Sequence, residues 1–436
     1  MKGPSMRCRT TVLFLIVALA TQLACADDWP QWRGANRDGL WREEGLLRSF
    51  PDKQVKVLWR AKIGPGYSGP TVADGRVYIT DRWNEDGTSE RIHCFDAKTG
   101  KNIWTHNYRC PYRVGFPLGP RASVTVDDGL AHVLGAMGHY HCLDAKTGAV
   151  IWKQDLSKTY RTRRILWGFA AAPLIYGDLV ILHIGGAGEA CIIALDKKTG
   201  AERWSAVDDG MSYSAPIIVK RGKNDLLICW TKNLLVGLAP KTGKVHWQIA
   251  YKIMKNWQMS SITPLIEGDY VFVSACYDGS MLVKLSPDGL KATKVWRSRG
   301  VAYGRTDALQ CVHSTPVVFG GHIYGFDSRG EMRCIKTATG ARVWEDLTIT
   351  PKKEKWGTAH MVQNGEITWI FNEQGEVIIA KLSPDGCKQL SRAQLIEPTH
   401  AMTGRKVCWS HPAFANRRIY ARNDKELVCG DLSAKK

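Results

Sequence analysis

Two small sets of side chains in this sequence could carry catalytic or metal chemistry. His139 and His141 form a His-x-His pair in GHYHCLD, and on a strand this spacing turns both imidazoles to one face, where they could hold a metal. Tetrahedral zinc needs further ligands and the sequence identifies none, so we predict no metal site. Asp307, in GRTDALQC, is the one loop carboxylate that we nominate as a general base, against the alternative of a solvated loop aspartate.

Histidines precede three apolar strands, as His313 in VHSTP, His360 in TAHMV and His411 in SHPAF. Corresponding positions elsewhere in the chain hold Tyr67, Arg121, Tyr213, Ser261 and Trp409. If these strands start around one common opening, polar and aromatic side chains converge there, which is the usual make-up of a small-ligand site. The alternative is that they fill a central channel with hydrogen-bonded side chains and water. None of these patterns identifies a catalytic residue.

Basic residues with tryptophans nearby form a further set. Arg161, Arg163 and Arg164 are the densest basic cluster, and tryptophans stand among basic residues at Trp167, Trp257 and Trp356. Arginine beside aromatic rings suits sulfated or phosphorylated glycans, anionic lipid headgroups or an acidic protein. The chain as a whole has a net charge of +19, so the alternative is that its exposed loops simply share this charge. We expect an anionic partner and no nucleic acid.

The positions of these side chains follow a repeat of about 48 residues. Its clearest part is a turn followed by tryptophan, as in FDAKTGKNIW and LDAKTGAVIW, and LSPDGCKQL is a degraded copy. Tryptophans at this repeat position are Trp59, Trp104, Trp152, Trp204, Trp247, Trp296 and Trp344. A proline introduces an apolar strand in most repeats, as in SGPTV. Four short strands per repeat, with an indole that docks on the next repeat, are typical of propeller blades.

The two ends of the chain complete one repeat together. The last copy has strands at residues 411–415, 418–422 and 426–432 but no fourth strand, whereas residues 55–60 form a lone fourth strand with its tryptophan. Pairing the two would leave no exposed sheet edge. We therefore predict an all-β fold, an eight-bladed β-propeller of four-stranded antiparallel blades over residues 55–436, closed by the N-terminal strand. Residues 27–54 precede it as a capping segment.

The first 26 residues are predicted to be a secretory signal peptide. A basic start is followed by an uncharged apolar run at residues 11–23 and by Ala24-Cys25-Ala26, so we place the cut after Ala26 and the protein in the periplasm or outside the cell. The alternative is a lipid anchor at Cys25, although Gln22 stands where a lipoprotein signal has an aliphatic residue. No later apolar run is long enough to span a membrane.

The repeat, together with the opening DWPQWRGANRDG from Asp27, resembles the eight-bladed propellers of the pyrroloquinoline quinone (PQQ) type. Two branches share that fold: quinoprotein alcohol and sugar dehydrogenases, and the propeller subunit of the outer-membrane β-barrel assembly machine, which is a non-enzymatic scaffold. The first branch would imply PQQ with calcium at the channel mouth. This chain departs from it, because it has no adjacent cysteine pair, no C-x-x-C-H haem site and only short loops.

Cysteines are numerous, with 13 in the whole chain. Cys94, Cys142, Cys334 and Cys429 share one repeat position, which other repeats fill with alanine or glycine, so we interpret them as small buried residues. Cys110, Cys311 and Cys408 fall in loops between blades, where a disulfide could form but cannot be assigned.

These observations favour an exported, monomeric, non-catalytic binding or scaffold protein for a protein or an anionic envelope polymer, with no cofactor. The alternative is a PQQ-dependent dehydrogenase that acts on an alcohol or a sugar. A carbohydrate lyase or hydrolase would need a pair of carboxylates at the mouth, and the sequence offers none there.

Overall fold

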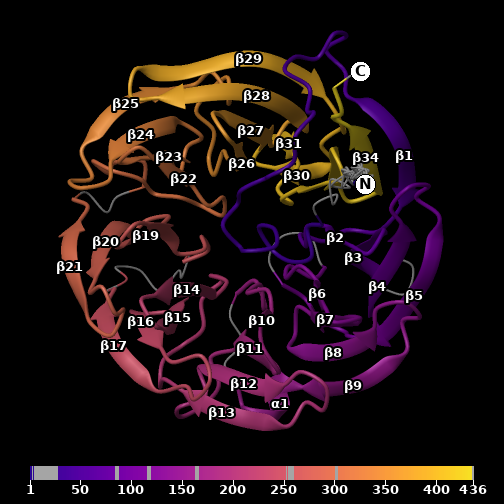
Figure 1. Ribbon diagram of the computed structural model, residues 1–436, viewed down its shortest axis with the longest axis vertical. Coiled ribbons are helices and arrows are strands. Elements are labelled where there is room, and N and C mark those ends of the chain that lie inside the picture. Colours follow the sequence, from indigo (N-terminus) through magenta and orange to yellow (C-terminus); the bar gives the residue numbers. More distant parts are fainter. Residues whose placement is uncertain are drawn as a thin grey trace.

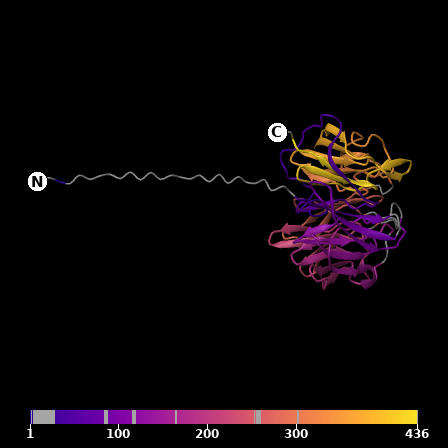
Figure 2. The same cartoon turned by 90° about the vertical axis from the view of Figure 1, so that its right-hand side faces the viewer.

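The computed structural model describes residues 1, 3, 28–83, 88–114, 119–162, 166–251, 253, 260–299 and 303–434. Within these residues, eight four-stranded antiparallel sheets stand around a central axis (Figure 1). Seen from the side, the ring forms a disc (Figure 2). The eight-bladed propeller predicted from the repeat is confirmed.

Seven blades are made of consecutive strands, with the innermost strand first. Blades 1 to 4 are β2 (Thr71–Ala73), β3 (Arg76–Trp83), β4 (Ser89–Asp96), β5 (Asn102–Arg109); β6 (Thr125–Asp127), β7 (Leu130–Leu134), β8 (His139–Asp144), β9 (Val150–Asp155); β10 (Leu174–Tyr176), β11 (Leu179–His183), β12 (Ile192–Asp196), β13 (Glu202–Ala206); and β14 (Ile217–Arg221), β15 (Asn224–Trp230), β16 (Leu234–Leu238), β17 (Val245–Ala250). Blades 5 to 7 are β18 (Leu265–Glu267), β19 (Tyr270–Ala275), β20 (Gly279–Leu285), β21 (Ala292–Arg297); β22 (Val317–Phe319), β23 (His322–Phe326), β24 (Met332–Lys336), β25 (Arg342–Asp346); and β26 (Ala359–Asn364), β27 (Ile367–Asn372), β28 (Glu376–Ser383), β29 (Gly386–Gln394). One short helix, α1 (Leu156–Thr159), follows β9.

Blade 8 is assembled from both ends of the chain. Its inner strands are β32 (Ala413–Ala415), β33 (Arg418–Arg422) and β34 (Glu426–Asp431), and its outermost strand is β1 (Lys56–Lys62). β1 runs antiparallel to β34, with Trp59 opposite Cys429. The N-terminal strand therefore covers the edge of β34 that would otherwise be open to pairing with another chain.

Tryptophans on the outermost strands of seven blades join each of these blades to the next. The Nε1 atom of Trp104 on β5 donates a hydrogen bond of 3.1 Å to the carbonyl of Ala145, in the β8–β9 turn of blade 2. The same bond, at 2.9–3.1 Å, is made from Trp59 to Ala97, Trp152 to Lys197, Trp204 to Pro240, Trp247 to Gly289, Trp296 to Thr337 and Trp344 to Ser383. Each indole thus fills the seam between two blades and satisfies its polar atom there.

The residue opposite a docking tryptophan is small in most blades. Cys94 lies directly across from Trp104 in the β4–β5 pair, and Cys142, Ala194, Gly237, Cys334 and Cys429 occupy the same position in other blades. Leu282, opposite Trp296, is the exception. These cysteines are buried, and at this position a thiol acts as a small apolar side chain beneath an indole.

The segment before β1 crosses the ring on the face turned toward the viewer in Figure 1, where it is drawn in indigo. It begins beside blade 1, where the backbone of Trp29 pairs with Val72. It then reaches the seam between blades 7 and 8, where Trp41 packs on Trp369 and Phe414 at ring distances of 5.4 and 5.0 Å. Blade 7 has Ser391 at the docking position, so Trp41 adds a large aromatic side chain to a seam that has no docking tryptophan.

One connection is more elaborate than the sequence predicted. Between blades 7 and 8 the chain forms an extra hairpin of β30 (His400–Met402) and β31 (Arg405–Val407). Arg405 fixes it to blade 7, because its Nε donates to the Glu373 carboxylate at 2.8 Å. A three-residue hairpin gives too short an alternation to recognise in a sequence, so this connection was predicted only as a loop.

Candidate functional site

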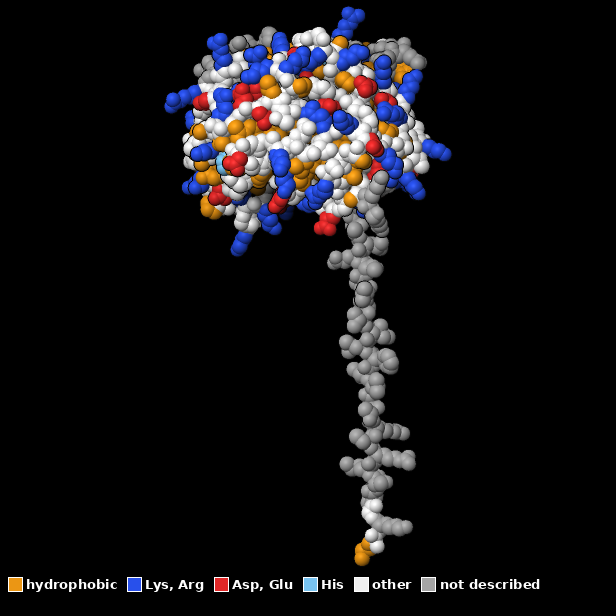
Figure 3. Space-filling view, turned by 90° about the horizontal axis from the view of Figure 1, so that it is seen from above, with side chains coloured by type: hydrophobic (Ala, Val, Ile, Leu, Met, Phe, Trp, Pro, Cys, Tyr) orange, Lys and Arg blue, Asp and Glu red, His pale blue; other side chains and the backbone are white. Residues whose placement is uncertain are grey.

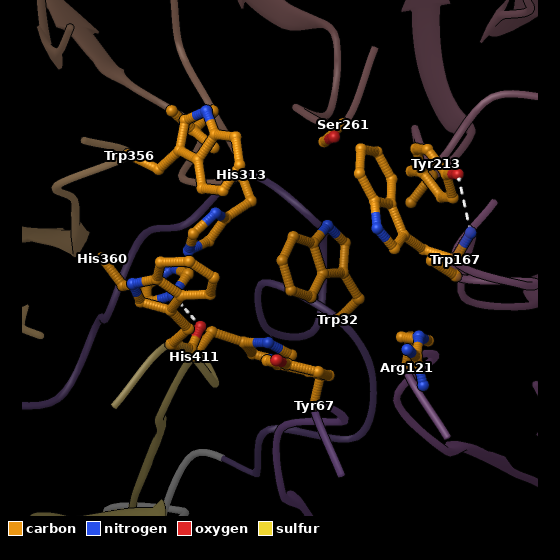
Figure 4. Close-up of a pocket in the computed structure, with 14 residues that line it drawn as sticks. Trp32, Tyr67, Arg121, Trp167, Tyr213, Ser261, His313, Trp356, His360 and His411 are labelled. Atoms are coloured by element: carbon orange, nitrogen blue, oxygen red, sulfur yellow. Dashed lines mark hydrogen bonds between the residues drawn. The ribbon is translucent and has the colours of Figure 1, made fainter. Parts of the chain in front are cut away.

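A cavity of about 190 Å³ opens at the centre of one face of the ring, which we call the mouth (Figure 4). It is formed by the connections that lead from each outermost strand to the next innermost strand. Its lining is Trp32, Tyr67, Arg121, Trp167, Ala170, Tyr213, Ala215, Ser261, Val312, His313, Trp356, His360, Trp409 and His411. The structure thus brings together all eight residues that the sequence placed at a common opening, while their role in binding stays a prediction.

The repeat explains why these residues converge. Several lining residues stand three positions before the proline that introduces an innermost strand, namely Tyr67, Ala170, Tyr213, Ser261, His313 and Trp409. Side chains alternate along extended backbone, so the residue just before the proline points in the same direction as the residue three positions before the proline. The residue just before the proline lies further into the channel. His411 takes this deeper position before Pro412. One repeated local geometry therefore lines the mouth from every side.

Trp32 closes the mouth from below, and the sequence did not identify it as a site residue. Its Nε1 donates to the Thr263 hydroxyl at 2.6 Å, and its ring meets His411 edge-on at 4.1 Å between centroids. It belongs to the N-terminal segment, which lies at the far ends of the innermost strands, since the Asp28 carboxylate accepts from the Asp74 backbone in the β2–β3 turn. The one sequence feature that pointed to it was the opening DWPQWRGANRDG, which lies outside the repeat.

Arg37, in the same segment, anchors this floor to the ring. Its guanidinium is buried and donates to the carbonyls of Ala172 and Pro216 at 3.2 and 3.1 Å, and also to the carbonyl of Pro173. These carbonyls belong to blades 3 and 4, on the opposite side of the channel from blade 8. Burial lowers the pKa of Arg37 to about 9. The segment therefore spans the channel and closes it beneath the mouth.

Three imidazoles form one wall of the mouth. The rings of His313 and His360 lie 5.8 Å apart, and those of His360 and His411 lie 6.0 Å apart. Burial lowers the pKa of His313 to about 3 and that of His360 to about 4, and it lowers the pKa of His411 well below the usual range. At neutral pH these side chains are therefore uncharged. They can donate or accept hydrogen bonds, but they are weak bases.

Arg121 is the positively charged residue of the lining. Its guanidinium lies 5.3 Å from the centre of the Tyr67 ring, and it donates to the carbonyl of Gly119. The nearby carboxylate of Glu90 is buried beneath the surface and accepts hydrogen bonds from the hydroxyls of Tyr108 and Tyr112. Burial raises the pKa of Glu90. No carboxylate or thiol is among the described residues that line the mouth.

Trp167 and Trp356, which the sequence analysis grouped with the basic residues, also form walls of the mouth. The indole Nε1 of Trp356 bonds to the Tyr277 hydroxyl at 3.2 Å, and the backbone amide of Trp167 donates to the Tyr213 hydroxyl at 3.3 Å. Repeat spacing could not reveal this, because both tryptophans lie in irregular connections whose path is fixed by tertiary contacts.

The predicted basic cluster is only partly described. Arg161 is exposed at the end of α1, whereas Arg163, Arg164 and Trp257 lie outside the described residues. Viewed edge-on, lysine and arginine side chains are spread over the whole visible rim of the disc, with acidic side chains between them (Figure 3). In this view, the basic side chains are therefore not concentrated near either face of the disc.

The candidate general base Asp307 and the His139–His141 pair, considered above as metal ligands, lie outside the lining of the mouth. Asp307 is exposed, and both its carboxylate oxygens accept from the Arg299 backbone, at 2.9 and 3.1 Å. His141 is buried against Tyr108 at 4.3 Å between ring centres, while His139 lies 3.4 Å from the Cys110 sulfur through Nδ1. Among the described residues, no three His, Cys, Asp or Glu side chains are arranged to hold a metal.

The described cysteines all have free thiols, and Cys110, Cys311 and Cys408 are buried. No helix among the described residues is long and apolar enough to cross a membrane.

Comparison with known proteins agrees with the geometry of the fold. The structure resembles the outer-membrane assembly protein BamB from Moraxella catarrhalis, with a TM-score of 0.57 at 17% identity, covering 86% of this chain and 99% of that one. It also resembles the quinohemoprotein alcohol dehydrogenase from Comamonas testosteroni, with a TM-score of 0.63 at 14% identity, covering 94% of this chain and 81% of that one. At these identities the likeness establishes the fold alone.

Two proteins with similar sequences are quinoprotein dehydrogenases. A quinoprotein ethanol dehydrogenase of Pseudomonas aeruginosa is 28% identical over 204 residues, which are 45% of this chain and 22% of that protein. The quinoprotein alcohol dehydrogenase PedH of Pseudomonas putida is 25% identical over 260 residues, which are 58% of this chain and 32% of that protein. The chain thus spans no more than a third of the length of these relatives.

The family model described as outer membrane protein assembly factor BamB matches residues 43–112 and 88–346, which together make up well over half of the chain. The eight blades, their docking tryptophans and this match lead to one conclusion: the chain belongs to the BamB-like family of PQQ-type repeat propellers.

Proposed function

We propose that this chain is an exported, non-catalytic binding protein that holds a partner protein or an anionic polymer at the mouth of its propeller. The observation that carries the proposal is the chemistry of the lining. It combines aromatic rings, neutral imidazoles and Arg121, with no carboxylate or thiol among its described residues. Such a surface can bind and orient a ligand, but it lacks a strong base, a nucleophile and a pair of carboxylates for hydrolysis.

Family membership supports this proposal without deciding it. The matching family is described as an outer-membrane protein assembly factor, a role in which a propeller would bind proteins rather than transform a substrate. Export is supported by the predicted leader with its cut after Ala26, or by an anchor at Cys25.

The alternative function is that of a PQQ-dependent dehydrogenase, and the curated relatives favour it. The tryptophan walls suit a flat ring system. The donor set does not suit the rest of the cofactor, because calcium takes six to eight oxygen ligands, usually including carboxylates. Within the described lining, the side-chain oxygens are the hydroxyls of Ser261, Tyr67 and Tyr213. PQQ carries three carboxylates, and Arg121 is the one arginine of this lining that could pair with them. The part of the lining that the structure describes therefore does not fit PQQ with calcium.

Reconstitution tests the proposal directly. Purified protein is mixed with PQQ and calcium, and the quinone absorbance and the reduction of an artificial electron acceptor are followed with a series of alcohols and sugars. We expect no acceptor reduction above that of free PQQ. Reduction that requires protein, quinone and substrate together would overturn the non-catalytic assignment.

A further inference from the structure

Fixed aromatic faces surround the mouth. Trp32 lies between Trp167 and Trp356 in Figure 4, so that indoles border the same space from below and from two sides. Hydrogen bonds from Trp32 to Thr263 and from Trp356 to Tyr277 set the orientation of two of these rings. Because the rings are held in place before any ligand arrives, little conformational freedom is lost on binding. The mouth is therefore a ready surface for a flat, ring-shaped ligand.

Polar atoms beside these rings indicate which kind of ring-shaped ligand would bind. The Tyr67 hydroxyl and the His313 Nε2 have no hydrogen-bond partner among the described residues. A purely aromatic ligand, such as a phenylalanine side chain, would leave such atoms unpaired, which is unfavourable. A ring that carries several hydroxyl groups would supply partners at its edge while its face lies on an indole. This combination describes a sugar ring better than an aromatic side chain.

The charge of the mouth selects against cations. Aromatic walls alone would suit an ammonium group, but Arg121 lies in the lining and the Lys355 ammonium lies 4.4 Å from the centre of the Trp356 ring. The lining has no carboxylate within its described residues, and Glu90 nearby is engaged by two tyrosine hydroxyls. Arginine pairs well with a carboxylate. The favoured ligand is therefore an anion.

The floor restricts how a polymer could enter. Trp32 closes the mouth from below, and Arg37 ties its segment to blades 3 and 4 across the channel. A chain cannot thread through the ring from this side. We therefore expect a single unit, or the end of a longer polymer, to occupy the cavity.

We infer that the mouth binds one acidic sugar ring, a pyranose with a carboxylate group, as a free unit or at the end of an anionic polysaccharide. This inference rests on the proposed binding function and names its ligand class. The sugar ring would lie against the indoles, its hydroxyls would meet the tyrosine, serine and histidine side chains, and its carboxylate would pair with Arg121.

Titration with defined sugars tests the inference. Galacturonic acid, short oligogalacturonides and the matched neutral galacto-oligosaccharides are added to the full-length mature protein, and binding is followed by tryptophan fluorescence and calorimetry. We expect the acidic sugars to bind about tenfold or more tightly than the neutral ones. We expect the affinity per molecule to be independent of chain length, because each chain presents one end.

Four substitutions separate the contributions of charge and of the aromatic rings to sugar binding. Arg121→Gln should remove the preference for acidic sugars and leave the weak binding of neutral sugars, whereas Trp167→Ala should weaken both. Lys146→Gln, in the exposed β8–β9 turn on the opposite face, removes one positive charge as a matched control and should change neither. Melting curves show whether each variant is folded, and Arg121→Lys, which keeps the charge, should recover part of the preference.

The outcomes distinguish this inference from the proposed function. Equal affinity for acidic and neutral sugars, or tighter binding of an acidic peptide than of any sugar, would overturn the ligand class and leave the binding function standing. Cleavage or oxidation of a bound oligogalacturonide, seen by mass spectrometry, would instead overturn the non-catalytic function.

Discussion

Trp104 and Gly148 meet across the seam between blades 1 and 2. Gly148 has a φ of +76°, and a Cβ atom at this position would lie 2.6 Å from the indole of Trp104. The same relationship joins Trp59 to Gly100, Trp152 to Gly200 and Trp204 to Gly243. Glycine is therefore required at this turn position for two reasons: the backbone is left-handed, and a side chain would clash with the neighbouring indole.

A comparison of Gly129 with Gly148, both in blade 2, distinguishes the effect of backbone conformation from that of the indole contact. Gly129 has a φ of +73° with open space around it, whereas Gly148 has the same backbone strain and the indole contact. Gly148→Ala should lower the free energy of unfolding by about 1 to 3 kcal/mol more than Gly129→Ala, because only the former also overpacks the seam. Urea unfolding of both variants measures the difference. Equal losses would show that backbone strain alone acts at Gly148.

Loss of a docking indole should cost more than loss of its neighbour on the same strand. Trp152→Ala removes the seam contact and the bond to the Lys197 carbonyl, so we expect a loss of about 3 to 5 kcal/mol. Ile151→Ala is the matched control, since Ile151 is 50% exposed, and its loss should stay below about 1 kcal/mol. Thermal or urea unfolding compares them. Similar losses at both positions would contradict the docking role.

The sequence predicted those parts of the molecule that repeat. Position in the repeat identified the docking tryptophans, and position before the innermost strand identified His313, Tyr213 and the other six residues predicted at the mouth. Both predictions depend on local geometry that each blade reproduces, so a single alignment of the chain with itself was sufficient. The closure by residues 55–60 followed from counting strands, because an unpaired edge is costly.

Residues outside the repeat could not be placed in this way. Trp32 and Trp41 belong to one short segment, yet Trp32 forms the floor of the mouth and Trp41 packs in the seam where blade 7 has Ser391 at the docking position. Their positions depend on contacts with residues more than 200 positions away, which no local pattern encodes. The same holds for Trp167 and Trp356, whose connections are irregular.

Removal of the N-terminal strand tests the closure. A chain that starts after residue 62 lacks β1 and exposes the edge of β34, so we expect aggregation and a lower melting temperature. Light scattering and thermal unfolding provide the measurements. A monomer with an unchanged melting temperature would mean that the pairing of β1 with β34 does not hold the ring closed.

The basic cluster predicted from the sequence makes a distinct prediction about salt. Arg161, Arg163 and Arg164 changed together to Ser should lower retention on a heparin column if the cluster binds polyanions, and thermal unfolding measures whether stability is affected. Lys98, Lys146 and Lys241 lie in exposed turns of the opposite face and give a control with the same loss of charge. If both triple variants elute at the same lowered salt concentration, net charge alone governs the retention.

Stability should fall in mild acid because of the imidazoles at the mouth. Burial lowers the pKa of His313 to about 3 and that of His360 to about 4, whereas a histidine in the unfolded chain titrates near 6.5. Between these values the unfolded chain binds more protons than the folded one. The stabilisation is therefore fully present above about pH 6.5 and is lost progressively as the pH falls toward the folded values, with a slope of up to about 1.4 kcal/mol per pH unit for each histidine.

His360→Gln isolates one of these contributions. The Nε2 of His360 bonds to the Trp409 carbonyl at 2.8 Å, and a glutamine amide can donate the same bond without titrating. Between about pH 6.5 and pH 5.5 this variant should lose about 1 kcal/mol less stability than the unchanged protein. Urea unfolding across that range measures both. Parallel losses would show that His360 is protonated equally in the folded and unfolded states, and the account of a neutral, buried imidazole wall would then be wrong.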